Sequence, residues 1–121
     1  MNLPSALAAA GLLLAAAFST AAQAHAKLES SSPKANAVVT PAPKEVRLQF
    51  NEPLEIAFSK VKVMDAKGAE VAPLKADLDK ANPKVMVAAL PALHAGPYRV
   101  QWTTLTRDGH KVKGEFSFQV K

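Results

Sequence analysis

The segment Tyr98–Val120, YRVQWTTLTRDGHKVKGEFSFQV, decides the fold of this chain, because two alternating runs flank one turn signal. In both runs apolar or β-branched residues alternate with polar ones, which is typical of strands with one buried face and one wet face. The residues of the buried parity are Val100, Trp102, Thr104, Phe116, Phe118 and Val120. Between the runs, Asp108-Gly109-His110 is a hairpin-turn sequence, since Gly109 tolerates positive φ.

The same alternation recurs through the rest of the chain after residue 25, and eight prolines divide it into short segments. The residues assigned to buried positions there are Val46, Leu48, Phe50, Val61, Val63, Val85 and Val87. The predicted strands are residues 26–31, 45–51, 57–65, 69–72, 84–90, 98–106 and 111–120. Seven short strands with turn signals between them predict an all-β fold, a single two-sheet Greek-key β-sandwich.

Three details of this prediction are local. Phe58 has the opposite parity to Val61 and Val63, which predicts a β-bulge near Ser59. The strand at 69–72 has the weakest pattern, and a loop is the alternative there. Apolar residues fall at helical spacing only in a single turn near Leu74 to Leu78.

Composition excludes several classes of protein. The 121 residues contain no Cys, so disulfides, thiolate metal sites and cysteine nucleophiles are absent. The charge and apolar content after residue 24 suits one compact domain and excludes a disordered chain. No second long apolar run follows the first, which argues against a multi-pass membrane protein.

The first 24 residues are predicted to be a cleaved signal peptide, leaving one domain at 25–121. They carry no Lys, Arg, Asp or Glu, and the apolar stretch Ala6–Phe18 is too short to span a bilayer. Ala22-Gln23-Ala24 forms an A-x-A cleavage signature, and cleavage there makes His25 the first residue of a periplasmic protein without a membrane span. Ala24-His25-Ala26 also fits the signature, and cleavage after Ala26 removes this histidine.

Strand parity leads three polar residues to one end of the sandwich, and the expected strand order adds a fourth. The buried parity of residues 46–50 continues to Glu52, that of 100–104 continues to Asp108, and that of 116–120 leads back to His110. In an immunoglobulin-like strand order, the chain start with His25 shares this end with both loops. His94 falls at the opposite end and is assigned to the surface.

These residues suit one Cu(II) ion. An N-terminal His25 offers its α-amine and Nδ1 as a chelate, His110 adds an imidazole and Asp108 a carboxylate oxygen. Nitrogen and oxygen donors in a tetragonal arrangement favour Cu(II), whereas Zn(II) prefers a tetrahedral site. Because the donors must be deprotonated, copper affinity should weaken as the pH falls from 8 to 5.

The sequence resembles the CopC family of periplasmic copper-resistance proteins over the whole chain after the signal peptide. The matching segments are HAKLESSSP at 25–33, LQFNEPL at 48–54, AGPYRVQW at 95–102 and DGHKVKGEFSFQV at 108–120. The resemblance implies an immunoglobulin-like or cupredoxin-like β-sandwich or barrel. It also implies a Cu(II) site formed by His25, Asp108 and His110, with Glu52 as a nearby polar group that orients a ligand.

Some family members carry a methionine-rich loop that binds Cu(I), and this chain departs from them. After residue 25 it has only Met64 and Met86, both at predicted strand positions, where packing and surface roles are expected. The resemblance therefore implies a Cu(II)-only carrier or buffer in copper resistance, homeostasis or uptake, without catalytic activity. The expected partners are copper and an inner-membrane copper transporter or another periplasmic copper protein.

Two other functions remain open at this stage. A copper-dependent oxidoreductase of the histidine-brace type shares the N-terminal histidine chelate, although Asp108 would crowd its copper. If cleavage follows Ala26, the mature chain lacks His25, and the sequence is then interpreted as a metal-free exported module for adhesion or assembly. The net charge of +5 is spread along the sequence without a basic-aromatic cluster for nucleic acid, and the protein is expected to be a monomer.

Overall fold

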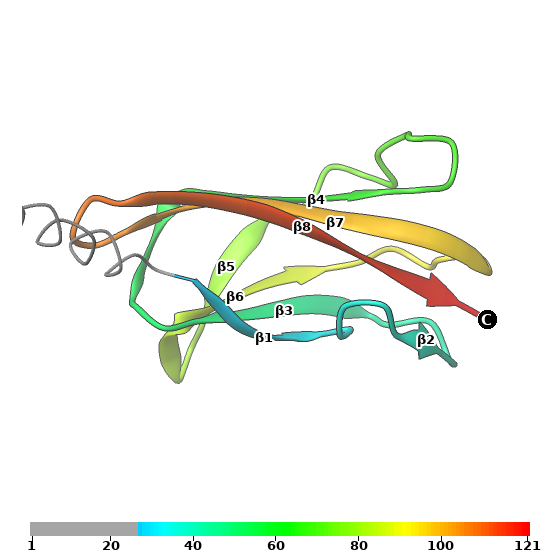
Figure 1. Cartoon of the computed structure of the whole chain (residues 1–121), viewed down its shortest axis with the longest axis horizontal. Helices are drawn as coiled ribbons and strands as arrows, with labels where there is room; N and C mark the ends of the chain where they lie inside the picture. The colour runs from blue at the N-terminus through cyan, green and yellow to red at the C-terminus, as the bar shows by residue number, and fades with distance from the viewer. Residues whose placement is uncertain (1–26) are drawn as a thin grey trace, which may run out of the picture.

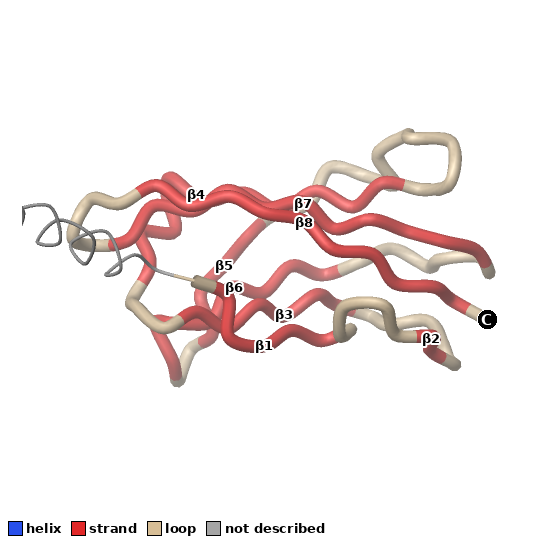
Figure 2. Tube along the Cα trace, viewed as in Figure 1, coloured by secondary structure: helices blue, strands red, loops and turns tan. Residues whose placement is uncertain are grey.

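Two four-stranded sheets stack face to face in the computed structural model, which describes residues 27–121 (Figure 1). The predicted signal peptide and His25 lie outside the described residues. Figure 2 shows strands joined by turns and loops over the whole described part of the chain. Residues 27–121 contain no helix long and apolar enough to cross a membrane. The predicted all-β sandwich is confirmed.

One sheet has the strand order β1-β3-β6-β5 and the other has the order β2-β8-β7-β4. The strands are β1 Leu28–Ser32, β2 Val38–Val39, β3 Glu45–Phe50, β4 Leu54–Met64, β5 Ala76–Asp79, β6 Asn82–Ala89, β7 Gly96–Thr106 and β8 Lys111–Val120. The β2–β8 pair is parallel and the other pairs are antiparallel. The β7–β8 hairpin is the longest paired unit, with register from Gly96 opposite Val120 to Leu105 opposite Lys111.

The core lies between the sheets and consists of the inward residues of alternating strands. Val46, Leu48 and Phe50 of β3 are fully buried, as is Val100 of β7. Trp102 packs edge-on against Phe50, with ring centroids 6.2 Å apart. The parity assigned from sequence to β3, β4, β7 and β8 is confirmed by this core.

The burial assigned to β6 was right for Val85, which is 5% exposed, and wrong for Val87. Met86 and Ala88 are buried in the core, whereas Val87 is only half-buried. The reason is the pairing register: Met86 lies opposite Leu48 and Ala88 opposite Val46. Residues that face each other across antiparallel strands share one side of the sheet, so these two must point inward.

Three strand assignments also differ from the prediction, one strand lost and two gained, so the sandwich has eight strands instead of seven. Residues 69–72 form no strand, only an isolated bridge between Met64 and Glu70. The segment with one turn of helical spacing instead forms β5, because it pairs with β6 from Ala76 to Asp79. The two-residue β2 was not predicted, since its only partner is β8, far along the chain.

The predicted bulge near Ser59 is confirmed. The β4–β7 register shifts between Glu55 and Lys60, and Phe58 is left 67% exposed. The buried Ser59 hydroxyl donates to the Glu55 carbonyl at 2.9 Å and lies 2.8 Å from the Thr104 hydroxyl. These side-chain contacts replace the missing strand pairing and fix the bulge.

Candidate metal site

Three segments that are distant in sequence are tied together at one end of the sandwich. The backbone of Lys27, where the described chain begins, donates to Asn51 Oδ1 at 2.8 Å. In return, the Asn51 N–H donates to the Lys27 carbonyl at 3.2 Å. The Arg107 N–H donates to the Pro53 carbonyl at 3.2 Å, which joins the β7–β8 turn to the β3–β4 loop. Figure 1 shows this end on the left.

The β7–β8 turn is organised around the hydroxyl of Thr106, which is fully buried. This hydroxyl donates to the Asp108 carboxylate and accepts the His110 N–H at 3.0 Å. Backbone bonds close the turn, from Gly109 N–H to the Thr106 carbonyl and from Thr106 N–H to the His110 carbonyl, both at 2.9 Å. Gly109 has φ +95°, a conformation that glycine adopts without steric cost. The turn therefore holds Asp108 and His110 in a defined relation.

Asp108 and His110 face each other across this turn. Asp108 Oδ2 lies 3.2 Å from His110 Nδ1, and about half of each side chain is exposed to solvent. The hydrogen bond from Thr106 is the main cause that lowers the pKa of Asp108. Desolvation opposes the shift, while the charge of His110 and a hydrogen bond with Glu52 lower the pKa further. Glu52 thus adjoins Asp108, at the end of the sandwich where sequence parity put it.

The spacing of these two donors fits shared coordination of one ion. Donor atoms about 2.0–2.1 Å from an ion and at a right angle to each other lie about 2.8–3.0 Å apart. The observed 3.2 Å between Asp108 Oδ2 and His110 Nδ1 requires only a small movement to reach that geometry. Within residues 27–121, no three His, Cys, Asp or Glu side chains are grouped closely enough to hold a metal together. An ion held by this pair would need donors from elsewhere, and His25 lies outside the described residues.

Thr106 is the residue of this site that sequence reasoning missed. Its inward parity follows from the alternation of residues 100–104, but a threonine at the end of a strand carries no metal-binding signal of its own. The only available signal was its spacing, two residues before Asp108 and four before His110, which suits side-chain bonding within a tight turn.

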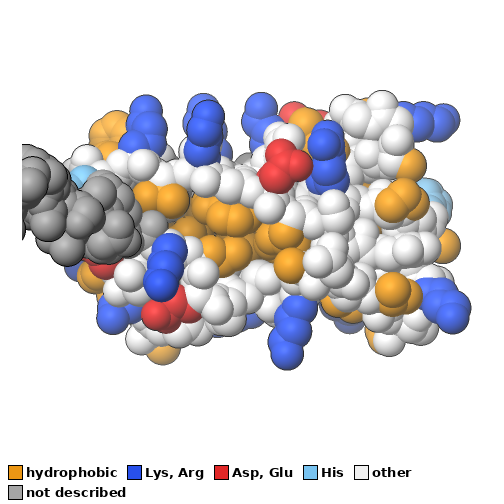
Figure 3. Space-filling model, viewed as in Figure 1, with side chains coloured by type: hydrophobic (Ala, Val, Ile, Leu, Met, Phe, Trp, Pro, Cys, Tyr) orange, Lys and Arg blue, Asp and Glu red, His pale blue; other side chains and the backbone are white. Residues whose placement is uncertain are grey.

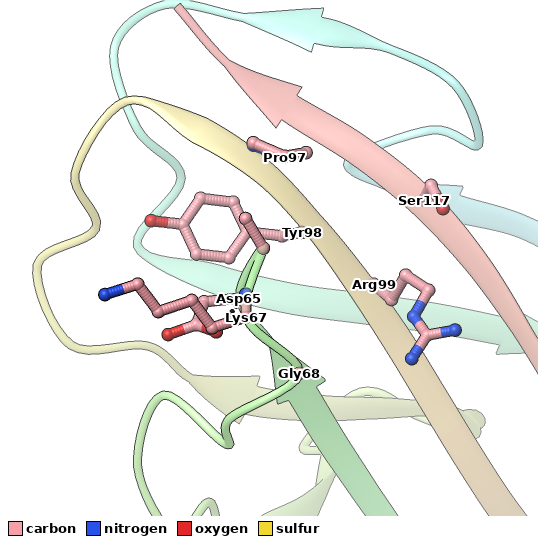
Figure 4. Close-up of a pocket in the computed structure, with 8 residues that line it drawn as sticks. Asp65, Lys67, Gly68, Pro97, Tyr98, Arg99 and Ser117 are labelled. Carbon is pink, nitrogen blue, oxygen red and sulfur yellow. Dashed lines mark hydrogen bonds between the residues drawn. The ribbon is translucent and has the colours of Figure 1, made fainter.

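Among residues 27–121, no histidine at the opposite end of the sandwich is paired with a carboxylate. His94 is exposed there, as predicted, and its carbonyl accepts the Tyr98 hydroxyl at 2.7 Å. A surface hollow is lined by the turn after β4 and by the start of β7, and Figure 4 shows Asp65 and Lys67 beside Tyr98. The Asp65 carboxylate accepts the backbone N–H groups of Lys67 and Ala69 at 2.8 and 3.0 Å. Asp65 thus shapes the turn.

Comparison with known proteins points to copper. The family model described as the CopC domain matches residues 28–121. Copper resistance protein C of Pseudomonas syringae pv. tomato is 42% identical over 122 residues, covering 95% of this chain and 92% of that protein. Copper transport protein CutJ of Bacillus subtilis (strain 168) is 36% identical over 98 residues, which cover 80% of this chain but 18% of CutJ.

A solved structure gives the same result for the fold. The crystal structure of CopC from Methylosinus trichosporium OB3b matches with a TM-score of 0.76 and 33% sequence identity. The match covers 80% of this chain and 94% of that one. The strand arrangement described above is therefore shared with that CopC, over nearly its whole chain.

Proposed function

The chain belongs to the CopC family, and on that premise we propose that it binds one Cu(II) ion at the end of the sandwich that carries Asp108 and His110. The observation that carries the proposal is the 3.2 Å separation of Asp108 Oδ2 and His110 Nδ1, beside the point where the described chain begins. Signal-peptide cleavage after Ala24 makes His25 the terminal residue, only two residues before Lys27. Its α-amine and imidazole would complete a set of three nitrogens and one oxygen, which suits Cu(II).

The methionines support a site for Cu(II) and not for Cu(I). Met86 is fully buried in the core on β6, and Met64 is half-buried on β4 in the other sheet. Cu(I) favours clusters of soft thioether or thiolate ligands. Two methionines on strands of different sheets do not provide such a cluster.

The role proposed is that of a periplasmic carrier or buffer for copper. Its relatives are named for copper resistance and for copper transport. CutJ contains a segment similar to this chain within a much longer copper transport protein, which supports a membrane copper transporter as a partner. A copper oxygenase is disfavoured, because Tyr98 and Trp102 are buried in the core and Phe58 is the one large aromatic side chain left exposed among residues 27–121, which is not a broad aromatic surface for a substrate.

The test begins with the secreted protein. Intact mass establishes whether the mature chain starts at His25, and competition with a chelator then measures Cu(II) affinity. Loss of a group that merely orients a ligand typically costs 10–100-fold, so His110→Ala, which removes a ligand, should cost at least about 100-fold. His94→Ala is the matched control, because His94 is an exposed histidine at the other end. Equal affinities of wild type and His110→Ala would refute the assignment.

A further inference from the structure

The charged residues of the two sheets differ in sign. Strands β4, β7 and β8 carry five Lys or Arg residues and two Glu residues, a net charge of +3. Strands β1, β3, β5 and β6 carry two Lys or Arg residues and four Asp or Glu residues, a net charge of −2. Lysines that look dispersed along the sequence are therefore gathered on one sheet by the fold.

The basic side chains share the outer face of their sheet. Lys60 and Lys62 of β4 and Lys111 and Lys113 of β8 are exposed, since the alternate residues of these strands face the core. Figure 3 shows Lys and Arg side chains along the upper edge of the molecule, over the sheet that contains β4, β7 and β8 in Figure 1. We define these four lysines and the outward side chains between them as the basic face.

The pairing register brings the lysines of the basic face into neighbouring rows. Lys60 lies opposite Thr103, and Thr103 lies opposite Lys113, so two lysines flank one threonine across three strands. Shallow hollows lie on both sides of Thr103, one lined by Lys60 and Lys62 and the other by Lys113. The face thus presents two rows of lysines with Thr103 and two shallow hollows between them.

The four lysines are not neutralised by the acids nearby. Glu115 pairs with Arg99 at 3.6 Å, and Glu55 pairs with Arg107 at 3.9 Å. Among residues 27–121, no carboxylate lies within ion-pair distance of the four lysines. An uncompensated positive surface attracts acidic partners and accelerates their association.

An exposed aromatic residue adjoins this face. Phe58 precedes Ser59 and Lys60 on β4 and is 67% exposed. The Ser59 hydroxyl is bonded to Glu55 and Thr104 within the bulge, so the backbone is fixed with Phe58 directed outward. Exposed aromatic residues beside charged rims are typical contact points of protein interfaces.

Both features lie toward the candidate copper site. Lys111 directly follows His110, and the β4 segment leading to Phe58 begins at Leu54, which pairs with Thr106. We propose that the basic face docks an acidic surface of a partner protein, with Phe58 as the apolar contact at the end nearest Asp108 and His110. The inference goes beyond copper binding, because it rests only on charge, register and exposure.

A protein suits this surface better than a membrane does. The face is a nearly regular sheet surface with polar Gln101, Thr103 and Glu115 among the lysines, and it has only one large exposed apolar residue, Phe58. Membrane-surface binding usually combines a wide apolar face with a basic one. Glu115 would also face the anionic headgroups.

The experiment titrates copper-free, ¹⁵N-labelled mature protein with decaglutamate at 50 mM and 150 mM salt, followed by amide NMR shifts. We expect shifts on β4, β7 and β8, and weaker binding at higher salt. The double variant Lys60→Glu with Lys113→Glu should lower the affinity for decaglutamate at least about tenfold, because its new carboxylates repel those of the peptide. The matched control, Lys80→Glu with Lys84→Glu, makes the same charge change on exposed residues of the β5–β6 hairpin and should lower affinity less than about threefold.

A second peptide, with leucine at its two central positions, tests Phe58. It should bind more tightly than decaglutamate, and Phe58→Ser should remove only that difference. If the double variant on the basic face and the control double variant lose the same affinity for decaglutamate, the proposal is overturned, because the overall charge of the protein would then explain binding. Cosedimentation with phosphatidylglycerol vesicles in the absence of peptide binding would overturn it in favour of a membrane. Since no copper is present, neither result bears on the copper site.

Discussion

Thr106 connects the interior of the sandwich to the candidate ligands. It is fully buried, and it is the last residue of β7, so its position is set by strand packing. Its hydroxyl contacts both the Asp108 carboxylate and the His110 N–H. The geometry of two exposed side chains therefore depends on one buried hydroxyl, as is common for groups that orient metal ligands.

Thr106→Val tests this dependence with little change in side-chain size. Without the hydroxyl, the pKa of Asp108 should rise, because that hydrogen bond is the largest cause of its lowering. A carboxyl with a lowered folded-state pKa stabilises the fold above its ordinary pKa, and the stabilisation is lost as the pH falls through the lowered value. In the variant the two pKa values lie closer together, so this stabilisation should be smaller and its loss should be complete at a higher pH. Carboxyl NMR titration of the copper-free protein measures the pKa directly.

The same variant should bind Cu(II) about 10–100-fold more weakly in chelator competition. Thr103→Val is the control, because Thr103 is exposed on the outer face of the same strand. An unchanged pKa of Asp108 together with unchanged copper affinity would mean that Thr106 has no orienting role.

At the scale of elements, the β7–β8 hairpin depends on a glycine that lies under an indole ring. Gly114 lies opposite Trp102 in the register. A Cβ added to Gly114 would be 2.4 Å from Trp102 Cζ2, closer than side chains can approach. Glycine is therefore required here to let the Trp102 ring pack closely against β8 and reach Phe50 in the other sheet.

Gly114→Ala should displace Trp102 and destabilise the fold by about 1–3 kcal/mol, the usual cost of overpacking. Urea unfolding measures the loss, and the fluorescence of Trp102, the only Trp in the chain, reports the displacement. Ser117→Ala is the control, because Ser117 is exposed on the same strand. A variant as stable as wild type, with unchanged fluorescence, would contradict the close packing of Trp102 on Gly114.

The elements that sequence predicted correctly are those with strong local patterns. β3, β7 and β8 alternate clearly, and their bounds differ from the prediction by at most two residues. β5 and the parity of β6 could not be predicted, because both follow from pairing between segments. The residues from Val85 to Val87 are all apolar, so either Met86 or its two neighbours could face the core. Only the register against β3 places Met86 inside.

At the scale of the whole molecule, functional surfaces are also hard to predict where they depend on pairing between distant segments. Extension of strand parity correctly brought Glu52 and Asp108 together, because both strands keep their alternation to the end. The basic face could not be foreseen, since Lys60 and Lys113 are neighbours only through Thr103. Whether His25 joins the site remains a prediction, because it depends on where the chain is cleaved.

Copper binding should stabilise the whole fold, because the proposed donors come from the chain start and from the β7–β8 turn, and the β3–β4 loop is bonded to both. A ligand at 100 times its Kd that binds only the folded state adds about 2.7 kcal/mol. Thermal unfolding with Cu(II) should therefore show a raised Tm for protein beginning at His25 and for its His94→Ala variant. Protein beginning at Lys27 lacks the terminal chelate and should gain much less. An equal gain in that shortened form would place the copper elsewhere and remove His25 from the site.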